Sequence, residues 1–346
     1  MKTQSKRKGN GKMKAKQIIG IVVTGVVIIA TGVTGVVSNI IRNRLIPEED
    51  KASNFWGLEE TVSVTLPAED FVGVINVVGE IGPSSDSIWA YEEGTYNHDL
   101  YMEYVDEMMY ADNNKGILLY IDSPGGTVYE SDELYLKLME YKEVTGRPIW
   151  AYFASQACSG GYYIGMAADK VYANRNCWTG SIGVIVSLMN CKDLYDKLGI
   201  KEIDITSGAN KAMGSSGLDL TQEQYDILQS LVDEAYDQFV GIVSTGRGMD
   251  EETVRTLADG RIYSAKQALE LNLVDAVGSL AEEKAVFAEE AGFSEDILYY
   301  EPEDMSLGFM SSFFGMLSEL KPQSDTELAK DIMENNGNGV LKYYAE

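Results

Sequence analysis

A serine followed by two glycines is the feature of this sequence that most directly suggests chemistry. Cys158-Ser159-Gly160-Gly161 follows an apolar segment, 148–154, and precedes a short run with helical character. Because the two glycines let a substrate backbone approach closely, the Ser159 hydroxyl is a candidate nucleophile. A purely structural helix cap is the alternative role for this serine. Cys158 is a second possible nucleophile, but strand alternation directs its side chain opposite to Ser159 and favours a small buried residue.

A serine nucleophile needs a general base, and the sequence offers few. His98 is the only histidine, and it lies in an acidic stretch, 91–99, that we predict to be a loop. A histidine-based triad and a multi-histidine metal site are therefore not expected. Lys211 is the remaining candidate, because it lies among small and apolar residues, and burial favours the neutral amine that a base requires. The alternative is an ordinary exposed lysine.

A second glycine turn lies between another apolar segment and a predicted helix. Asp122-Ser-Pro-Gly-Gly126 follows 116–121, and Thr127 with Glu130 forms a capping-box signature for the next helix. Free backbone N–H groups at a helix start favour a developing anion, so this turn is a candidate for oxyanion stabilisation. A simple tight turn is the alternative.

The elements that must position these residues alternate between strands and helices. The predicted strands are 71–78, 116–121, 148–154, 170–174, 181–188 and 200–207. The predicted helices are 100–109, the segment after Thr127, 159–168, 221–247, 264–271 and 280–291. This alternation indicates an α/β fold with a largely parallel sheet.

Charge and hydropathy divide the chain into an anchor and an outer part. The sequence has 28 Lys+Arg and 54 Asp+Glu, and this net charge of −26 argues against nucleic-acid binding. The segment 18–41 carries no formal charge and is long enough to span a bilayer, while cations crowd 1–16 and no acid precedes Glu48. We therefore predict a transmembrane helix with 1–17 in the cytoplasm and the rest extracytoplasmic. A cleaved signal peptide is the alternative, but the apolar run exceeds the usual ~7–15 residues and no A-x-A-like site follows it.

The outer part has a predicted linker, a predicted domain and a predicted tail, and it contains all three cysteines. We expect a polar linker at 42–68, a catalytic domain at 69–300, and an apolar helix with a flexible tail at 301–346. About 20 flexible residues span roughly 25 Å, so the tail is a candidate competitor or self-cleavage substrate for Ser159; a disordered end without a role is the alternative. Three cysteines without a C-x-x-C pair indicate neither a disulfide framework nor a zinc site, and no metal or other cofactor is expected.

Five motifs in a fixed order resemble signal peptide peptidase A, a family of membrane-anchored Ser/Lys peptidases with a ClpP/crotonase-type fold of repeated ββα units. The motifs are S-P-G-G (123–126), A-C-S-G-G-Y-Y (157–163), T-G-S-I-G-V (179–184), S-G-A-N-K (207–211) and D-G-R-I-Y-S-A-K-Q-A (259–268). The resemblance implies that Ser159 is the nucleophile, Lys211 the general base and Ser181 the hydroxyl that orients the lysine. It also implies an oxyanion hole formed by the N–H groups of Gly126 and Ser159. Cys158 departs from the alanine that is common in the family.

The resemblance covers about 70–280 and is to the short form, which has one copy of the domain. It implies that identical subunits assemble into a homo-oligomeric ring. The implied substrates are remnant signal peptides on the extracytoplasmic side, and the implied lipid contact is through the N-terminal helix. Two other functions stay open from the sequence: a crotonase-like acyl-CoA enzyme, which uses the same glycine turn, and a catalytically idle peptide-binding membrane module.

Overall fold

The computed structural model describes residues 64–84, 95–294, 296–302 and 342–344. All of them belong to one compact unit, residues 60–346. The predicted cytoplasmic segment 1–17, the predicted transmembrane helix 18–41 and most of the predicted C-terminal segment lie outside the described residues. Within the described ranges, no helix combines the length and the apolar character needed to cross a bilayer.

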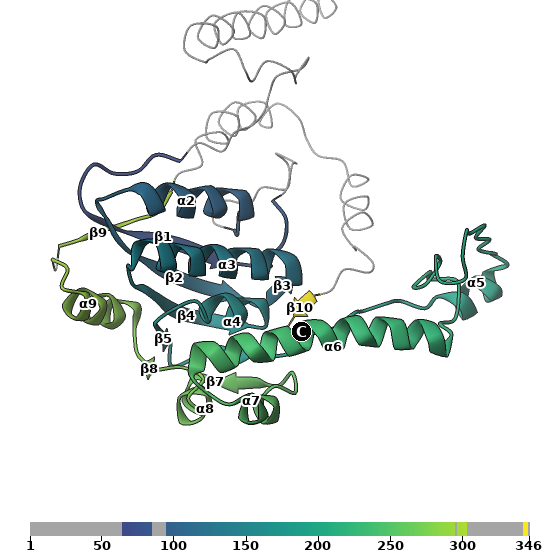
Figure 1. Ribbon diagram of the computed structural model, residues 1–346. Coiled ribbons are helices and arrows are strands. Elements are labelled where there is room, and N and C mark those ends of the chain that lie inside the picture. Colours follow the sequence, from purple (N-terminus) through teal and green to yellow (C-terminus); the bar gives the residue numbers. More distant parts are fainter. Residues whose placement is uncertain (1–63, 85–94, 295, 303–341, 345–346) are drawn as a thin grey trace, which may run out of the picture. The chain divides into compact units, whose positions relative to one another are not determined.

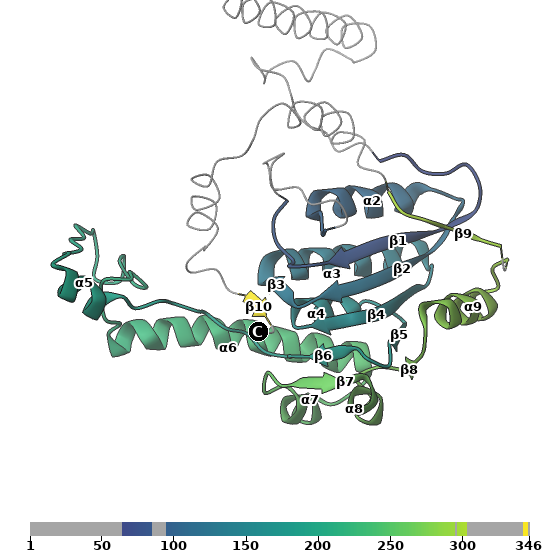
Figure 2. The same ribbon diagram turned by 180° about the vertical axis from the view of Figure 1, so that it is seen from behind.

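An eight-stranded sheet forms the centre of the described fold (Figures 1 and 2). Its strands are β1 (Phe71–Val78), β2 (Asn114–Ser123), β4 (Ile149–Cys158), β5 (Lys170–Ala173), β6 (Trp178–Gly180), β7 (Ile262–Ser264), β8 (Ala276–Val277) and β9 (Leu298–Tyr300). The order is β7-β6-β4-β2-β1-β9, with β5 beside β4 and β8 beside β5. Only the β6–β7 pair within this sheet is antiparallel, so the prediction of a largely parallel α/β sheet is confirmed.

The alternation of side chains along the strands creates two apolar faces. In β1, Ile75 and Val77 lie on the face covered by four helices, whereas Val72 and Val74 lie on the face covered by α9 (Leu280–Ala291). The four helices are α2 (His98–Tyr110), α3 (Val128–Thr145), α4 (Gly160–Gly165) and α6 (Gln222–Arg247). The helix starts at α4 and α3 bring both glycine turns to the four-helix face.

After β6 the chain leaves the sheet and forms an arm, which we define as residues 185–221. The arm contains α5 (Lys192–Leu198) and leads into the N-terminal end of α6 (Figure 1). The predicted strands 181–188 and 200–207 are wrong, because neither segment forms a strand in the structure. Their β-branched residues have the right propensity, but a strand also requires a continuous hydrogen-bonded neighbour, and in these two segments only Ile185 forms an isolated bridge.

The structure also differs from the sequence prediction in several short elements. The two helices α7 (Glu251–Leu257) and α8 (Ala265–Glu270) flank β7, and the turn at Gly126 forms a small strand, β3 (Gly125–Thr127). Thr127 is the N-cap of α3 as predicted, but its side chain caps no backbone amide. Its hydroxyl donates to the Glu130 carboxylate instead, so the predicted capping box does not form.

Candidate active site

Ser159 occupies a sharp turn between the end of β4 and the start of α4. Its φ of 53° and ψ of −117° lie outside the regions that non-glycine residues normally adopt. A backbone of this kind costs about 1–3 kcal/mol and tends to occur at functional sites. The Ser159 Oγ is buried and has no hydrogen-bond partner among the described residues. The fold therefore holds this hydroxyl in a strained position without using it for structure.

The two glycines after Ser159 permit close packing of the surrounding chain. A Cβ at Gly160 would overlap Ser131 Oγ and would lie 3.3 Å from the amide nitrogen of Gly126. A Cβ at Gly161 would lie 3.2 Å from the carbonyl oxygen of Ser123. These contacts place the turn at Gly126 directly beside the start of α4. Two motifs that are more than thirty residues apart in sequence thus form one site.

The backbone around Gly126 is fixed by hydrogen bonds to Ile81. Ile81 N–H donates to the Gly125 carbonyl at 2.9 Å, and Thr127 N–H donates to the Ile81 carbonyl at 2.8 Å. Because successive amides of an extended chain point to opposite sides, Gly126 N–H points away from Ile81. A side chain at Gly126 would overlap the Ile81 backbone, which explains the glycine. Gly126 N–H is therefore directed to the side of β3 on which β10 pairs, and its role as an oxyanion donor stays a prediction.

The second predicted donor is already engaged in the sheet. Ser159 N–H donates to the Gly180 carbonyl at 2.8 Å, so it is not available to a substrate oxygen in this structure. Gly160 N–H is the first amide of α4 and has no acceptor among the described residues. Sequence reasoning missed this group, although the first amide of a helix is normally left unpaired and could have indicated it.

Ser181 lies next to the nucleophile through the same hydrogen bond. Gly180, whose carbonyl accepts from Ser159 N–H, directly precedes Ser181, which is buried and has a φ of 50°. Ser181 N–H donates to the Arg261 carbonyl at 2.8 Å, and Gly260 N–H donates to the Ile182 carbonyl at 3.1 Å. The D-G-R motif thus holds the Ser181 turn to the loop that precedes β7.

Lys211 is not brought to Ser159 within the described chain. It lies in the arm, its side chain is exposed, and it forms no ion pair or side-chain hydrogen bond with another described residue. Figures 1 and 2 both show the part of the arm around α5 beyond the N-terminal end of α6, away from α4. The described residues around Lys211 therefore do not provide the burial that a lysine base requires.

His98 belongs to a structural cluster rather than to a loop. It is the first residue of α2, and its ring is buried between the Tyr96 hydroxyl, 2.6 Å from Nδ1, and Glu133 Oε2, 2.8 Å from Nε2. Desolvation opposes ionisation of Glu133, but hydrogen bonds from His98 and Tyr129 lower the pKa of its carboxyl. Of the predicted loop 91–99, residues 91–94 lie outside the described residues and 95–97 form neither helix nor strand, but 98 and 99 already belong to α2. Ser159 is not part of this cluster.

Cys158 is buried beside the candidate nucleophile and is poorly suited to replace it. Burial raises the pKa of its thiol to about 12, and its Sγ donates to the Trp178 carbonyl at 3.5 Å. A thiol with this pKa carries almost no thiolate at neutral pH. The prediction of a small buried cysteine is confirmed.

A short segment from the end of the chain lies along the predicted oxyanion turn. The strand β10 (Lys342–Tyr344) pairs antiparallel with β3, and Tyr343 lies opposite Gly126 (Figure 1). The main chain of β3 can therefore accept an added strand at this edge, a common mode of peptide binding.

Comparisons with known proteins give the family of this chain. Peptidase family S49 matches residues 142–294, and the Clp protease family matches residues 88–181. A predicted signal peptide peptidase SppA of Enterococcus faecium is 36% identical over 293 residues, which are 78% of this chain and 82% of that protein. A predicted protease of Synechocystis is 42% identical over 52% of this chain and 64% of its own length. The chloroplastic serine protease SPPA of Arabidopsis thaliana is 31% identical over 51% of this chain and 26% of its own length.

Proposed function

This chain belongs to the S49 family of serine peptidases, together with signal peptide peptidase A, and we propose that it cleaves peptides with Ser159 as nucleophile and Lys211 as general base. The observation that carries the proposal is the Ser159 turn. The buried Ser159 hydroxyl, which has no hydrogen-bond partner in the described part of the chain, lies in a strained turn next to the N–H groups of Gly126 and Gly160. A position of this kind suits a nucleophile that must approach a carbonyl carbon while two amides receive the carbonyl oxygen.

The proposed reaction has two steps. Neutral Lys211 Nζ takes the proton of Ser159 Oγ while Oγ bonds to the scissile carbonyl carbon, and the oxyanion accepts hydrogen bonds from Gly126 N–H and Gly160 N–H. The lysine then gives its proton to the leaving amine, and an acyl-serine remains. In the second step the lysine takes a proton from water, the resulting hydroxide bonds to the acyl carbon, and the proton returns to Ser159 Oγ as the ester breaks. Ser181 orients the lysine in this scheme.

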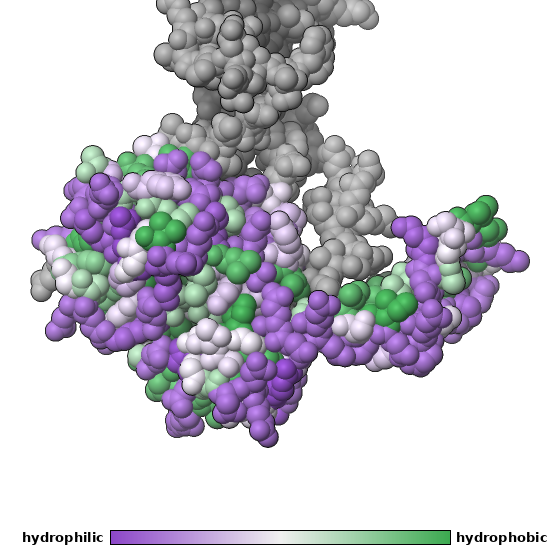
Figure 3. Space-filling model, viewed as in Figure 1, coloured by the Kyte–Doolittle hydropathy of each residue, from purple (hydrophilic) through white to green (hydrophobic). Residues whose placement is uncertain are grey.

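We propose that Lys211 comes from a second copy of the chain. The arm that carries it exposes a series of apolar side chains, and Figure 3 shows such side chains gathered near α5 and along α6. The exposed apolar residues of the arm are Ile185, Met189, Leu194, Leu198, Ile200, Ile203, Ile205, Leu218 and Leu220. A contiguous surface of this kind is typical of an interface. Contact with a neighbouring subunit would bury Lys211 and keep its amine neutral.

We further propose that substrates bind as an antiparallel strand on β3, in the place that β10 occupies. Hydrogen bonds to the β3 main chain would align the scissile bond with Ser159 whatever the side chains are. The proposed substrates are remnant signal peptides or other membrane-associated peptides. The proposed location is the extracytoplasmic side of the membrane, with the chain anchored by 18–41.

The decisive experiment mixes two inactive variants. Ser159→Ala and Lys211→Ala should each lower kcat by at least about a thousandfold, because the two groups act as one unit. When the variants are mixed 1:1 and reassembled, about one quarter of the sites in a closed ring receive both an intact serine and an intact lysine. Recovery of activity toward that level supports a dyad shared between subunits. Activity in Lys211→Ala alone above a tenth of the wild-type kcat would exclude Lys211 as the base.

A fluorophosphonate probe separates the nucleophile from the base. The probe should label Ser159 in the wild-type protein and leave the Ser159→Ala variant unlabelled. Labelling at another residue would contradict the assignment of Ser159, whereas normal labelling with no peptide cleavage would indicate a peptide-binding module.

A further inference from the structure

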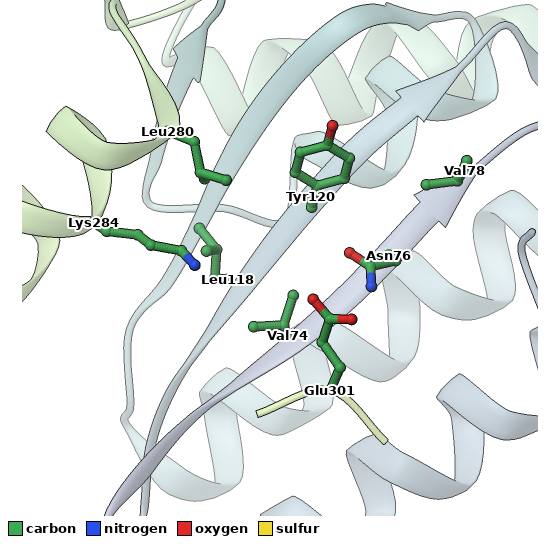
Figure 4. A pocket seen from close by; sticks show the side chains of 8 residues that line it. All are labelled: Val74, Asn76, Val78, Leu118, Tyr120, Leu280, Lys284 and Glu301. Atoms are coloured by element: carbon green, nitrogen blue, oxygen red, sulfur yellow. The ribbon is translucent and has the colours of Figure 1, made fainter. Parts of the chain in front are cut away.

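A cavity of about 300 Å³ lies on the sheet face opposite to Ser159 (Figure 4). Its floor is formed by outward-facing residues of β1 and β2, including Val74 and Leu118, and α9 contributes Leu280 to its wall. The α4 helix and the Ser159 turn belong to the other face of the sheet. The cavity is therefore distinct from the proposed peptidase site, and at this volume it fits a ligand of amino-acid size.

The polar groups of the cavity have opposite charges and come from different elements. Lys284 projects from α9, Glu301 follows β9, and Asn76 projects from β1; Figure 4 shows all three side chains directed toward the space between them. Such a combination of an apolar floor with one cation, one carboxylate and one amide is typical of a site that orients a small polar ligand.

The two charged groups are not neutralised by direct ion pairs. Among the described residues, neither Lys284 nor Glu301 forms an ion pair, with the other or with a third residue. The Lys284 ammonium group lies 4.3 Å from the centre of the Tyr299 ring. Desolvation lowers the pKa of Lys284, and the smaller opposite effect comes mainly from the Glu301 carboxylate. A half-buried cation in this situation gains from an added carboxylate.

We propose that this cavity binds a free α-amino acid with an aliphatic side chain. The ligand carboxylate lies at Lys284, its ammonium group lies at Glu301 with the Asn76 amide beside it, and its side chain packs on Val74, Leu118 and Leu280. Both charges of the ligand then meet an opposite charge, and its apolar part leaves water. This site does not depend on peptidase activity, and its ligand belongs to the class of molecules that complete peptide hydrolysis releases.

The test is isothermal titration calorimetry of the full-length Ser159→Ala protein with L-leucine at neutral pH. We expect a Kd of about 1 mM or lower. The analogues 4-methylpentanoate and 3-methylbutylamine lack the ammonium or the carboxylate group, and each should bind at least about tenfold more weakly. Because this variant has no nucleophile, failure of the binding prediction is distinguishable from failure of the peptidase proposal.

Variants then locate the binding site. Lys284→Met and Glu301→Gln should each weaken leucine binding at least about tenfold, while Lys266→Met on α8 and Glu289→Gln on the exposed side of α9 should leave it unchanged. Hydrogen exchange should show ligand protection in β1 and α9. A Kd above about 10 mM, unchanged binding in both cavity variants, or protection confined to β3 and α4 would each overturn the proposal.

Discussion

Apolar side chains are mostly buried in the body of the fold, by which we mean the described residues outside the arm, and they are mostly exposed in the arm. In the body, aromatic residues such as Tyr104, Phe153 and Phe239 are completely buried between the sheet and its helices. In the arm, Ile203 is 79% exposed and Ile205 is 98% exposed, and α5 buries none of its residues. Ser159 lies in the body and Lys211 lies in the arm. The two residues of the proposed dyad therefore come from regions that differ in how far their apolar side chains are buried.

Along the α6 helix, apolar side chains change from exposed to buried. Its C-terminal half buries Phe239, Val240 and Val243 against the body, whereas Tyr225 and Leu231 in its N-terminal half are exposed. The apolar pattern nevertheless continues along the whole helix. A helix with this pattern is expected to be covered along its length. The apolar surface of the arm and of the N-terminal half of α6 is the surface that the proposed assembly would cover.

The strongest way to break this comparison is to place a charge in the arm. Ile205→Asp should prevent assembly, because a carboxylate in a closing apolar interface is costly to desolvate. We expect kcat/KM to fall by about a thousandfold, equivalent to ~4 kcal/mol, although Ser159 itself is unchanged. Size-exclusion chromatography with light scattering and a peptide-cleavage assay measure the two effects together.

Val144→Asp is the matched control, since Val144 is an exposed β-branched residue of α3 in the body. This variant should keep both the assembly and the activity. A monomeric Ile205→Asp protein with full activity would show that one chain builds the complete site and that the arm has another purpose.

Glu283 is an ionisable residue buried in the body, where most other buried side chains are apolar. It therefore tests the energetics of the body. Its carboxylate is buried and has no hydrogen-bond partner among the described residues, and desolvation raises its pKa to about 9. The unfolded chain ionises this group near pH 4.5, so the folded state loses stability as pH rises from about 4.5 toward 9. Glu283→Gln cannot ionise and removes that loss.

We therefore expect Glu283→Gln to be more stable than the wild type at pH 8, by an amount on the order of 3 kcal/mol, and to lose most of this advantage at pH 5. Urea unfolding of the full-length chain at both pH values gives the difference. A stability difference that is the same at pH 5 and pH 8 would show that the carboxyl group finds a partner or reaches water.

The sequence predicts an element of this fold well when the signals that define the element lie within its own residues. Strand 71–78 matches β1, and 221–247 matches α6 with Thr221 as its cap, because hydrophobic periodicity and capping are local properties. The segments 181–188 and 200–207 look like strands by composition, but strand formation depends on a neighbour that composition does not reveal. The arm conformation is therefore the part of the fold that sequence reasoning missed.

In the candidate site, too, features within one motif were predicted, and features that depend on distant partners were not. Ser159, Gly126 and Ser181 were predicted from motifs, and the structure brings their turns together. The proposed role of Gly160 N–H follows only from the hydrogen bond that Ser159 N–H donates to the Gly180 carbonyl. The partners of His98 also escaped prediction, since Glu133 lies on a separate helix and nothing in the sequence indicates which face it presents.

A smaller effect is expected at Ser181, the residue proposed to orient the lysine. Ser181→Ala should lower kcat about tenfold, or ~1.4 kcal/mol, with little change in KM, because the loss is in positioning the base and not in binding the peptide. Ser181→Thr should restore part of the rate by returning the hydroxyl. An Ala variant with wild-type kcat would assign Ser181 to the turn alone.

The smallest expected effect concerns the segment that joins the end of the chain to the body. If β10 occupies the strand position that substrates use, it competes with them, and deletion of residues 342–346 should lower the apparent KM about threefold without changing kcat. The factor is modest because three ladder residues offer only a few hydrogen bonds, each of which contributes about 1 kcal/mol or less after the cost of ordering the tail. Steady-state kinetics of the truncated and full-length chains measure it, and mass spectrometry of the active protein beside Ser159→Ala shows whether the tail is also cut. An unchanged KM together with identical full-length masses would mean that β10 covers the β3 edge without entering the path of the substrate.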